Sequence, residues 1–329
     1  MNISTENRRV SIAPMMAWTD RHCRYFHRLL NPAVLLYTEM VTTGAVLHGD
    51  LDKLLAYSSA EQPLALQLGG GDPADLAAAA VVAQQWGYAE VNLNVGCPSD
   101  RVQKGKIGAC LMKEPELVAD CISAMRTAVD IPVTVKCRLG VDELESYAYF
   151  YDFISQIATT GCQHFIIHAR KAWLSGLSPK QNREIPPLRY DWVYRLKQEL
   201  PELHISINGG ITDFPSIDEH LQRVDAVMLG RVAYQHPWIL ARLDSANVTS
   251  REQVVLAMAS YADQLPEVPV KHISRHMLGL YQGQPGAKQW RRFISENAYK
   301  FPAGGDLLRA ALAQLENARA RHRISTELA

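Results

Sequence analysis

The residue with the clearest chemical potential is Cys97, which lies in a tight turn directly after an apolar run. The segment VNLNVGCPS (91–99) changes from a strand-like pattern to Gly-Cys-Pro, so the backbone presents the thiol. A thiol with an ordinary pKa of roughly 8.5 is mostly protonated at neutral pH and can donate a proton, whereas a nucleophile would need a lowered pKa. The same loop contains no histidine to activate it. Cys97 is therefore the candidate proton donor, and Cys110, at the end of KGKIGAC, is its one rival.

Two further residues place a polar side-chain group at the end of an apolar run. These are Lys136 and His168, and burying such groups costs free energy unless a partner or a ligand is present. The ordinary explanations are a satisfied core histidine and a pair between Lys136 and Glu39. Gln67 ends a third run, and this clustering favours a binding site in which a cation could stabilise an anion.

A pair of methionines follows the first apolar run, in the sequence Pro14-Met15-Met16. Methionine gives a soft, polarizable surface that can lie against a flat ring, although it is most often core filler. Their polar neighbours favour interpreting them as a surface for a planar ligand.

Glycines end the last two apolar runs, as Asn208-Gly209-Gly210 and Gly230-Arg231. Without side chains, backbone N–H groups can approach phosphate oxygens closely, and Arg231 would add charge. Either stretch alone could be a simple turn. Together, at the strand ends where barrels commonly hold phosphate, they predict a phosphorylated ligand.

The elements that must position these residues alternate regularly along the chain. Eight short apolar runs begin at residues 11, 34, 64, 90, 133, 164, 204 and 226. Helical patterns separate them, as in 72–87, where Asp72 can cap, Pro73 fits the first turn and Gly87 ends the helix. Eight such units over about 240 residues predict an α/β fold, a (β/α)8 TIM barrel rather than a doubly wound sheet. The candidate residues above then share its C-terminal mouth, where barrels carry their chemistry.

A second domain is indicated because the alternation of strand and helix patterns stops after His236-Pro237. From Ser250 onward only helical patterns occur, so we expect a barrel domain at 1–245 and a small helical domain at 246–329. Basic and acidic residues balance over the chain, at 34 each, but 11 basic residues face 7 acidic ones from Ser250 onward. Any nucleic-acid partner must therefore be bound by a local patch of basic residues rather than by the overall charge of the chain. Lys288, Arg291 and Arg292 form one such cluster.

Composition also excludes several classes of protein. The six cysteines form no CxxC pairs, so the sequence suggests neither a metal site nor a disulfide framework. The first residues lack the apolar core of a signal peptide, and no run approaches the ~18 apolar residues of a membrane span. We expect a cytoplasmic protein with reduced thiols and no membrane contact.

The ordered motifs APMM, TEM, LQLGG, NLNVGCPS, VTVKCRLG, HAR, INGG and LGR resemble those of the tRNA-dihydrouridine synthases over nearly the whole chain. The longer segments LYTEMVTTGAVLHGD and HARKAWLSGLSPKQNREIPPL resemble the A-type subfamily, which acts at positions 20 and 20a of tRNA. One local departure is Cys137, where relatives are expected to have Thr or Met. Its side chain should point to the opposite face of the strand from Lys136.

This resemblance implies FMN as cofactor, NADPH as electron source and a D-loop uridine of tRNA as substrate. Reduced FMN would deliver hydride from N5 to C6 of the uracil, and Cys97 would protonate C5. The flavin would be lined by Pro14, Met15, Met16, Gln67, Lys136 and His168. Its phosphate would be held by Asn208, Gly209, Gly210, Gly230 and Arg231. The uracil would face Asn94 and Arg170. The tRNA backbone would meet Lys288, Arg291 and Arg292, with Lys180 and Arg183 as a second candidate surface.

Three alternatives remain at this point. Another FMN barrel, such as a dihydroorotate dehydrogenase, would share the phosphate site, but the helical domain and the loop SPKQNR argue against it. A non-catalytic RNA-binding or chaperone-like barrel would bind no flavin. A phosphate-binding isomerase is disfavoured because no carboxylate base is evident. No obligate protein partner is evident either.

Overall fold

The computed structural model describes residues 9–99, 105–243 and 249–327, with side chains described up to residue 319. The chain divides into two compact units. The first comprises Met1–Ala17 and Ala33–Gly230, and the second comprises Trp18–Pro32 and Arg231–Ala329. The boundary expected between residues 245 and 246 lies outside the described residues and stays a prediction.

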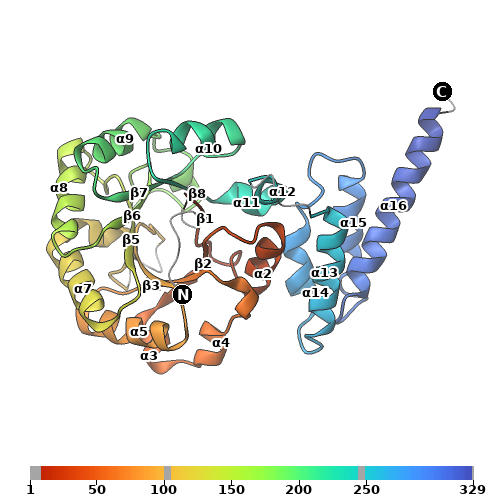
Figure 1. Cartoon of the computed structure of the whole chain (residues 1–329), viewed down its shortest axis with the longest axis horizontal. Helices are drawn as coiled ribbons and strands as arrows, with labels where there is room; N and C mark the ends of the chain where they lie inside the picture. The colour runs from red at the N-terminus through yellow and green to blue at the C-terminus, as the bar shows by residue number, and fades with distance from the viewer. Residues whose placement is uncertain (1–8, 100–104, 244–248, 328–329) are drawn as a thin grey trace. The chain divides into compact units, whose positions relative to one another are not determined.

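The first unit is a barrel of eight parallel strands, as the sequence predicts (Figure 1). The strands are β1 (Val10–Ile12), β2 (Leu36–Thr42), β3 (Leu64–Gly69), β4 (Glu90–Val95), β5 (Val133–Arg138), β6 (His164–His168), β7 (His204–Asn208) and β8 (Ala226–Leu229). Their hydrogen-bonded order is β1-β8-β7-β6-β5-β4-β3-β2. The remaining gap is bridged where the backbone N–H of Ile12 donates to the carbonyl oxygen of Leu35, at 2.9 Å. The predicted (β/α)8 barrel is confirmed.

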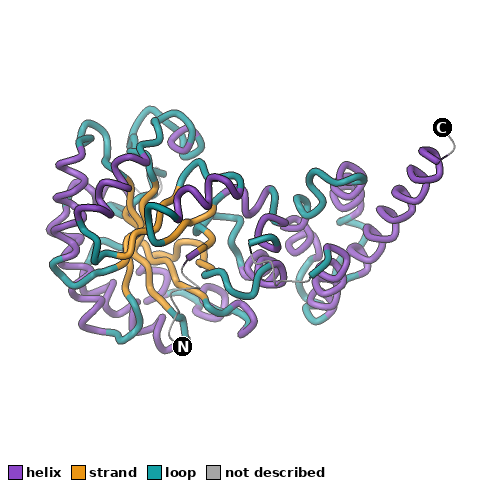
Figure 2. The backbone as a smooth tube through the Cα atoms, turned by 45° about the horizontal axis from the view of Figure 1, so that its top comes forward, coloured by secondary structure: helices purple, strands orange, loops and turns teal. Residues whose placement is uncertain are grey.

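Helices surround these strands (Figure 2). They are α3 (Thr43–His48), α4 (Leu51–Leu55), α5 (Pro73–Gln85), α7 (Pro115–Ala128), α8 (Tyr147–Ala158), α9 (Tyr190–Glu199) and α10 (Phe214–Leu221), with the 3-10 turns η1 (Ser59–Glu61), η2 (Gly108–Lys113) and η3 (Gln181–Arg183). The start of α5 matches the sequence prediction, since the side chain of Asp72 accepts the backbone N–H of Asp75 at 2.9 Å. All residues of β3 and β4 are buried, as expected for strands covered on both faces.

The second unit is helical. It contains α2 (Arg21–Leu30), α11 (Arg231–Gln235), α12 (Trp238–Ala241), α13 (Arg251–Asp263), α14 (Val270–Ser274), η4 (Arg275–Met277), α15 (Ala287–Asn297) and α16 (Asp306–Glu327). Ser250 and Gln253 form the expected capping box at the start of α13. The described residues from 249 onward contain no strand, as predicted. Within the described chain, no helix is long and apolar enough to cross a membrane.

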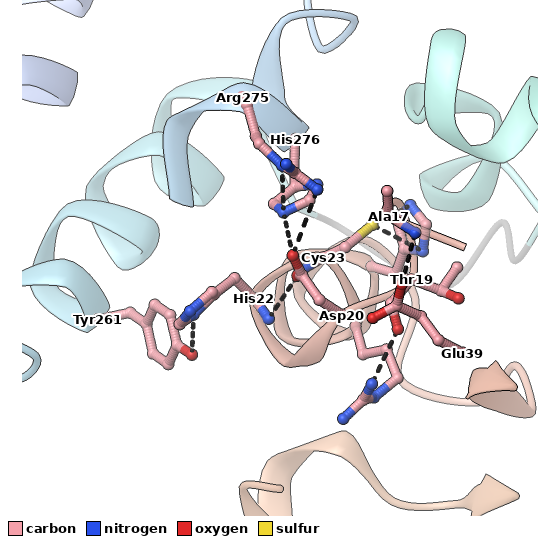
Figure 3. A network of polar contacts seen from close by, with 11 residues as sticks. Ala17, Thr19, Asp20, His22, Cys23, Glu39, Tyr261, Arg275 and His276 are labelled. Atoms are coloured by element: carbon pink, nitrogen blue, oxygen red, sulfur yellow. Dashed lines mark hydrogen bonds and ion pairs between the residues drawn. The ribbon is translucent and has the colours of Figure 1, made fainter. Parts of the chain in front are cut away.

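Helix α2 belongs to this second unit although it lies between β1 and β2 in the sequence. Asp20 caps its first turn, and Oδ2 of the same carboxylate lies 3.0 Å from Nε2 of His276 (Figure 3). The ring of Tyr25 stacks on that of Tyr261, with centroids 4.1 Å apart. These contacts join segments more than 200 residues apart in sequence, so no local pattern could have indicated them.

Candidate active site

The register of the parallel strands brings the predicted residues to one end of the barrel. Asn94 on β4 lies opposite Lys136 on β5. One strand further, His168 on β6 lies opposite Asn208 on β7. Asn94, His168 and Asn208 lie at or next to the last residue of their strands. Lys136 lies two residues before the end of β5, so all four are near the carboxyl ends, where barrel enzymes carry their chemistry. The register therefore places these residues near one rim of the barrel, and their role in a common site stays a prediction.

Lys136 makes its polar contact inside the mouth. Its Nζ donates a hydrogen bond to Oδ1 of Asn208 at 3.2 Å. Glu39, the alternative partner considered from the sequence, instead accepts the backbone N–H of Ala17. Burial, followed by the nearby charge of Arg138, lowers the pKa of Lys136 to about 8. Among the described residues, this partly exposed amine donates its side-chain hydrogen bond to a neutral amide rather than to a carboxylate.

His168 has a buried nitrogen that no described residue satisfies. Its side chain is 9% exposed, and Nδ1 has no hydrogen-bond partner among the described residues. Burial is the main reason that its pKa falls well below 6.5, and the charges of Arg138 and Lys136 lower it further. The imidazole is neutral at physiological pH, and its unmatched nitrogen fits a bound polar ligand better than a closed core.

The glycines after β7 and β8 differ in their surroundings. Gly210 has a φ of +74°, and a Cβ built there would lie 2.6 Å from Leu188 Cδ1 and 2.7 Å from the hydroxyl of Tyr190. A Cβ on Gly230 would meet nothing within 4 Å. Gly210 is therefore required by the backbone, whereas Gly230 borders open space. Arg231 follows it directly as the first residue of α11.

Asn94 shapes the turn that carries Cys97. Its Oδ1 accepts the backbone N–H groups of Gly96 at 3.0 Å and Cys97 at 2.9 Å, and its Nδ2 donates to Oε1 of Gln67 at 2.9 Å. The carbonyl oxygen of Cys97 in turn accepts the N–H of Ala109 at 2.9 Å. The thiol is partly buried and sits on a turn that is anchored on both sides.

The rival thiol is engaged differently. Cys110 donates from Sγ to the carbonyl oxygen of Ile107 at 3.0 Å, and burial raises its pKa. The Sγ of Cys97 instead lies 3.6 Å from the hydroxyl of Ser99. Cys137 is fully buried whereas Lys136 beside it is partly exposed, in agreement with the expected alternation of faces.

Arg138 has a role that the sequence did not indicate. The side chain is 4% exposed, and burial lowers its pKa to about 10. Its Nε donates to the carbonyl oxygen of Gly96 at 2.9 Å, and Nη1 donates to those of Lys171 at 2.9 Å and Asn182 at 3.0 Å. One buried guanidinium thus ties the Cys97 turn to the loop after β6. An arginine that ends an apolar strand was the available signal.

The loop after β6 carries the second group of predicted basic residues. Its organiser is Asn182, which is 0% exposed, accepts the N–H of Trp173 at 2.8 Å and donates to the carbonyl oxygen of Trp173 at 2.9 Å. Lys180 and Arg183 lie on either side of it and are exposed. Arg170 is partly buried at the start of the loop. The loop therefore has a fixed base and a basic surface.

In the second unit, Lys288, Arg291 and Arg292 are all exposed on α15. Arg292 pairs with Glu296 at 2.9 Å, and Arg291 donates to the side chain of Gln282 at 3.1 Å. Exposed pairs of this kind are worth little, so they leave these cations available to a partner.

Comparison with known proteins decides the family. The family model described as dihydrouridine synthase (Dus) matches residues 11–316. The chain belongs to the dihydrouridine synthase family. A relative from Vibrio parahaemolyticus named tRNA-dihydrouridine(20/20a) synthase is 57% identical over 320 residues, which cover 94% of this chain and 98% of the relative. One of the same name from Shewanella oneidensis is 57% identical over 318 residues, covering 94% and 95%.

Solved structures support the barrel fold of this family member. An old yellow enzyme homologue from Zymomonas mobilis matches with a TM-score of 0.53 and 12% identity, covering 75% of this chain and 92% of that chain. A 2-naphthoyl-CoA reductase complex matches with a TM-score of 0.54 and 13% identity, covering 71% and 49%. At such low identities the likeness concerns the fold alone.

We predict that a methyl group destabilises the protein at Gly210 but not at Gly230. Gly210→Ala should lower Tm, because alanine is strained at positive φ and would meet Leu188 and Tyr190. A loss of at least about 1 kcal/mol corresponds to roughly 2–4 °C for a domain of this size. Gly230→Ala should leave Tm of the flavin-free protein unchanged within about 1 °C. Thermal unfolding of both variants, followed by fluorescence, is the measurement, and equal losses would contradict the assignment of open space to Gly230.

Proposed function

We propose that this chain is an FMN-dependent, NADPH-driven tRNA-dihydrouridine(20/20a) synthase that acts in the cytoplasm. It would reduce the D-loop uridine at position 20, and that at 20a, to 5,6-dihydrouridine. The observation that carries the proposal is the 57% identity, over 94% of the chain, to relatives named for this activity. The mouth of the barrel adds three supporting features. They are the partly buried thiol of Cys97, the unmatched Nδ1 of His168 and the open space beside Gly230.

The residues of the mouth fit a flavin mononucleotide. Met15 packs against the apolar cluster at the barrel centre, whereas Met16 is 59% exposed. The two side chains together offer a polarizable surface that runs from the core to the solvent. The open space at Gly230, with Arg231 beside it, suits a phosphate. We assign the ring to Pro14, Met15, Met16, Gln67, Lys136 and His168. We assign the phosphate to Asn208, Gly209, Gly210, Gly230 and Arg231.

The chemistry then divides between cofactor and protein. When bound, a flavin reduced by NADPH would supply a hydride to C6 of the uracil ring and would itself be oxidised. Cys97 donates its proton to C5, so the C5–C6 double bond becomes a single bond, and the thiolate recovers a proton from solvent. Cys110 is less suited, because its thiol donates to a backbone carbonyl oxygen at 3.0 Å, whereas the Cys97 thiol makes only a longer contact of 3.6 Å to the Ser99 hydroxyl. Asn94 and Arg170 are the residues we expect to face the uracil.

The polynucleotide part of the substrate must be held while the uridine is exposed. Drawing a base out of its surroundings costs a few kcal/mol and needs contacts on the flanking backbone. Exposed cations on the two units offer these contacts. They are Lys180, Arg183, Lys288, Arg291 and Arg292.

The direct test incubates the purified protein with unmodified tRNA and NADPH and maps dihydrouridine by mass spectrometry. The proposal requires new dihydrouridine at position 20 or 20a. Activity on free pyrimidines and none on tRNA would favour a dihydroorotate dehydrogenase-like enzyme. A colourless protein that cannot be reconstituted with FMN would overturn the cofactor assignment.

A prediction on the cofactor follows from the open space at Gly230. Gly230→Ala should fold normally yet bind FMN at least about tenfold more weakly, which corresponds to roughly 1.4 kcal/mol, because the methyl group occupies the space assigned to phosphate. Fluorescence titration of the flavin-free protein measures this affinity. Riboflavin, which lacks the phosphate, is the control ligand and should bind wild type and variant alike. An unchanged affinity for FMN would place the phosphate elsewhere.

The two cysteines should separate in activity. Cys97→Ala should bind flavin and tRNA but form dihydrouridine about 10² to 10⁴ times more slowly, as expected when a general acid is removed. Cys110→Ala serves as the matched control and should stay close to wild type. Single-turnover assays of the reduced protein give the rates. Loss of activity in the Cys110 variant alone would show that Cys110, and not Cys97, is the proton donor.

The basic residues of α15 should determine how tRNA binding depends on salt. Replacing Lys288, Arg291 and Arg292 together by Ala should weaken affinity and flatten the plot of log affinity against log salt. Each lost phosphate contact should change the slope by somewhat under one, through counterion release. Oxidation of NADPH should persist in this variant, because the barrel is untouched. Identical slopes for wild type and variant would move the tRNA footprint to Lys180 and Arg183 or elsewhere.

A further inference from the structure

A buried carboxyl group begins a chain of polar contacts in the barrel. Glu90, the first residue of β4, is 0% exposed. Its Oε1 accepts hydrogen bonds from the hydroxyl of Tyr37 at 2.8 Å and from that of Thr134 at 2.6 Å. Tyr37 belongs to the apolar cluster at the centre of the barrel, so Glu90 faces the interior. Side chains alternate along a strand, and Asn92 and Asn94 therefore face the interior as well.

Three amides continue the chain from Thr134 to the Cys97 turn. Asn92 donates to the Thr134 hydroxyl at 2.9 Å, and Gln67 donates to Oδ1 of Asn92 at 2.7 Å. Asn94 donates to Oε1 of Gln67 at 2.9 Å and accepts the backbone N–H of Cys97 at 2.9 Å. Thr134, Asn92 and Gln67 are at most 1% exposed in the described structure, so these contacts are shielded from bulk solvent. In such surroundings a polar group left without a partner is costly in free energy.

The two ends of the chain fix its direction. At one end, Oε1 of Glu90 accepts two hydroxyl groups, and at the other the N–H of Cys97 can only donate. The Thr134 hydroxyl must donate to Glu90, so it can only accept from Asn92. Each amide between them then has a single orientation, since turning one would set donor against donor. Asn94 directs its oxygen at the Cys97 turn because its nitrogen is already committed to Gln67.

We propose that Glu90 and Thr134 are positioning residues for Cys97. They act through Asn92 and Gln67 to hold the Asn94 amide in the one orientation that keeps the Cys97 turn in place. The effect on catalysis rests on the proposed function, in which Cys97 is the proton donor. The effect on the conformation of the turn does not, because it concerns the flavin-free protein.

The test breaks the chain at Thr134 with a substitution of equal shape. Thr134→Val removes the hydroxyl, so Asn92 loses its acceptor and Glu90 loses one donor. We expect the looser turn to open locally more often and so to raise the rate of Cys97 alkylation by iodoacetamide about three- to tenfold, measured on the full-length, flavin-free protein by peptide mass spectrometry. Thr134→Ser retains the hydroxyl and should restore the wild-type rate.

A second control separates the chain from a general loss of stability. Tyr37→Phe removes the other hydrogen bond to Glu90 Oε1 but leaves the chain to Cys97 intact, so its alkylation rate should match wild type. Cys121 is fully buried and reports unfolding, because its alkylation requires the barrel to open. Should Thr134→Val expose Cys121, Asn92→Ser breaks the same chain and replaces it in the comparison.

The outcomes distinguish this inference from the proposed function. A wild-type Cys97 alkylation rate in the chain-breaking variant would overturn it, as would an equal increase in Tyr37→Phe. An altered rate together with no dihydrouridine formation by the wild-type protein would support the positioning role and reject the proposed activity. Faster alkylation in Thr134→Val with slower dihydrouridine formation, both restored by Thr134→Ser, would support both.

Discussion

The side-by-side register of β4 to β7 is the constraint from which the properties of this site follow. It sets Asn94 against Lys136 and His168 against Asn208, although these residues lie up to 114 positions apart. Parallel strands allow this because all their carboxyl ends meet at one rim. A slip of one residue in any pairing would turn that strand's side chains to the opposite face and dismantle the mouth.

The mouth is electrically unusual because its cations bond to neutral atoms. Lys136 contacts an amide oxygen, and Arg138 contacts three backbone carbonyls. Burial lowers the pKa of both, which means that the charged forms are held at a cost. An anionic or electron-rich ligand would offset that cost. Burial is the main cause that lowers the pKa of His168, and the same cations lower it further, so this cluster of charge also favours the neutral form of its neighbour.

Local patterns in the sequence were sufficient to predict the barrel and the strand ends. Alternation of apolar runs with capped helices predicted the first residue of each strand from β1 to β8 to within two residues. Partners distant in sequence were not predictable. The packing of α2 with the second unit depends on Asp20 meeting His276, and the role of Arg138 depends on three carbonyls from two loops. Neither contact leaves a periodic signal in the sequence.

A barrel interior filled by aliphatic side chains would be simpler to stabilise than one crossed by amides and a carboxyl group. Apolar packing, however, has no direction, and it cannot determine which atom of Asn94 points at the Cys97 turn. A chain of hydrogen bonds has direction, because each donor must meet an acceptor. The polar chain from Glu90 thus costs some stability but determines the orientation of Asn94. Glu90, at the amino end of β4, thereby influences the Cys97 turn that follows the carboxyl end of the same strand.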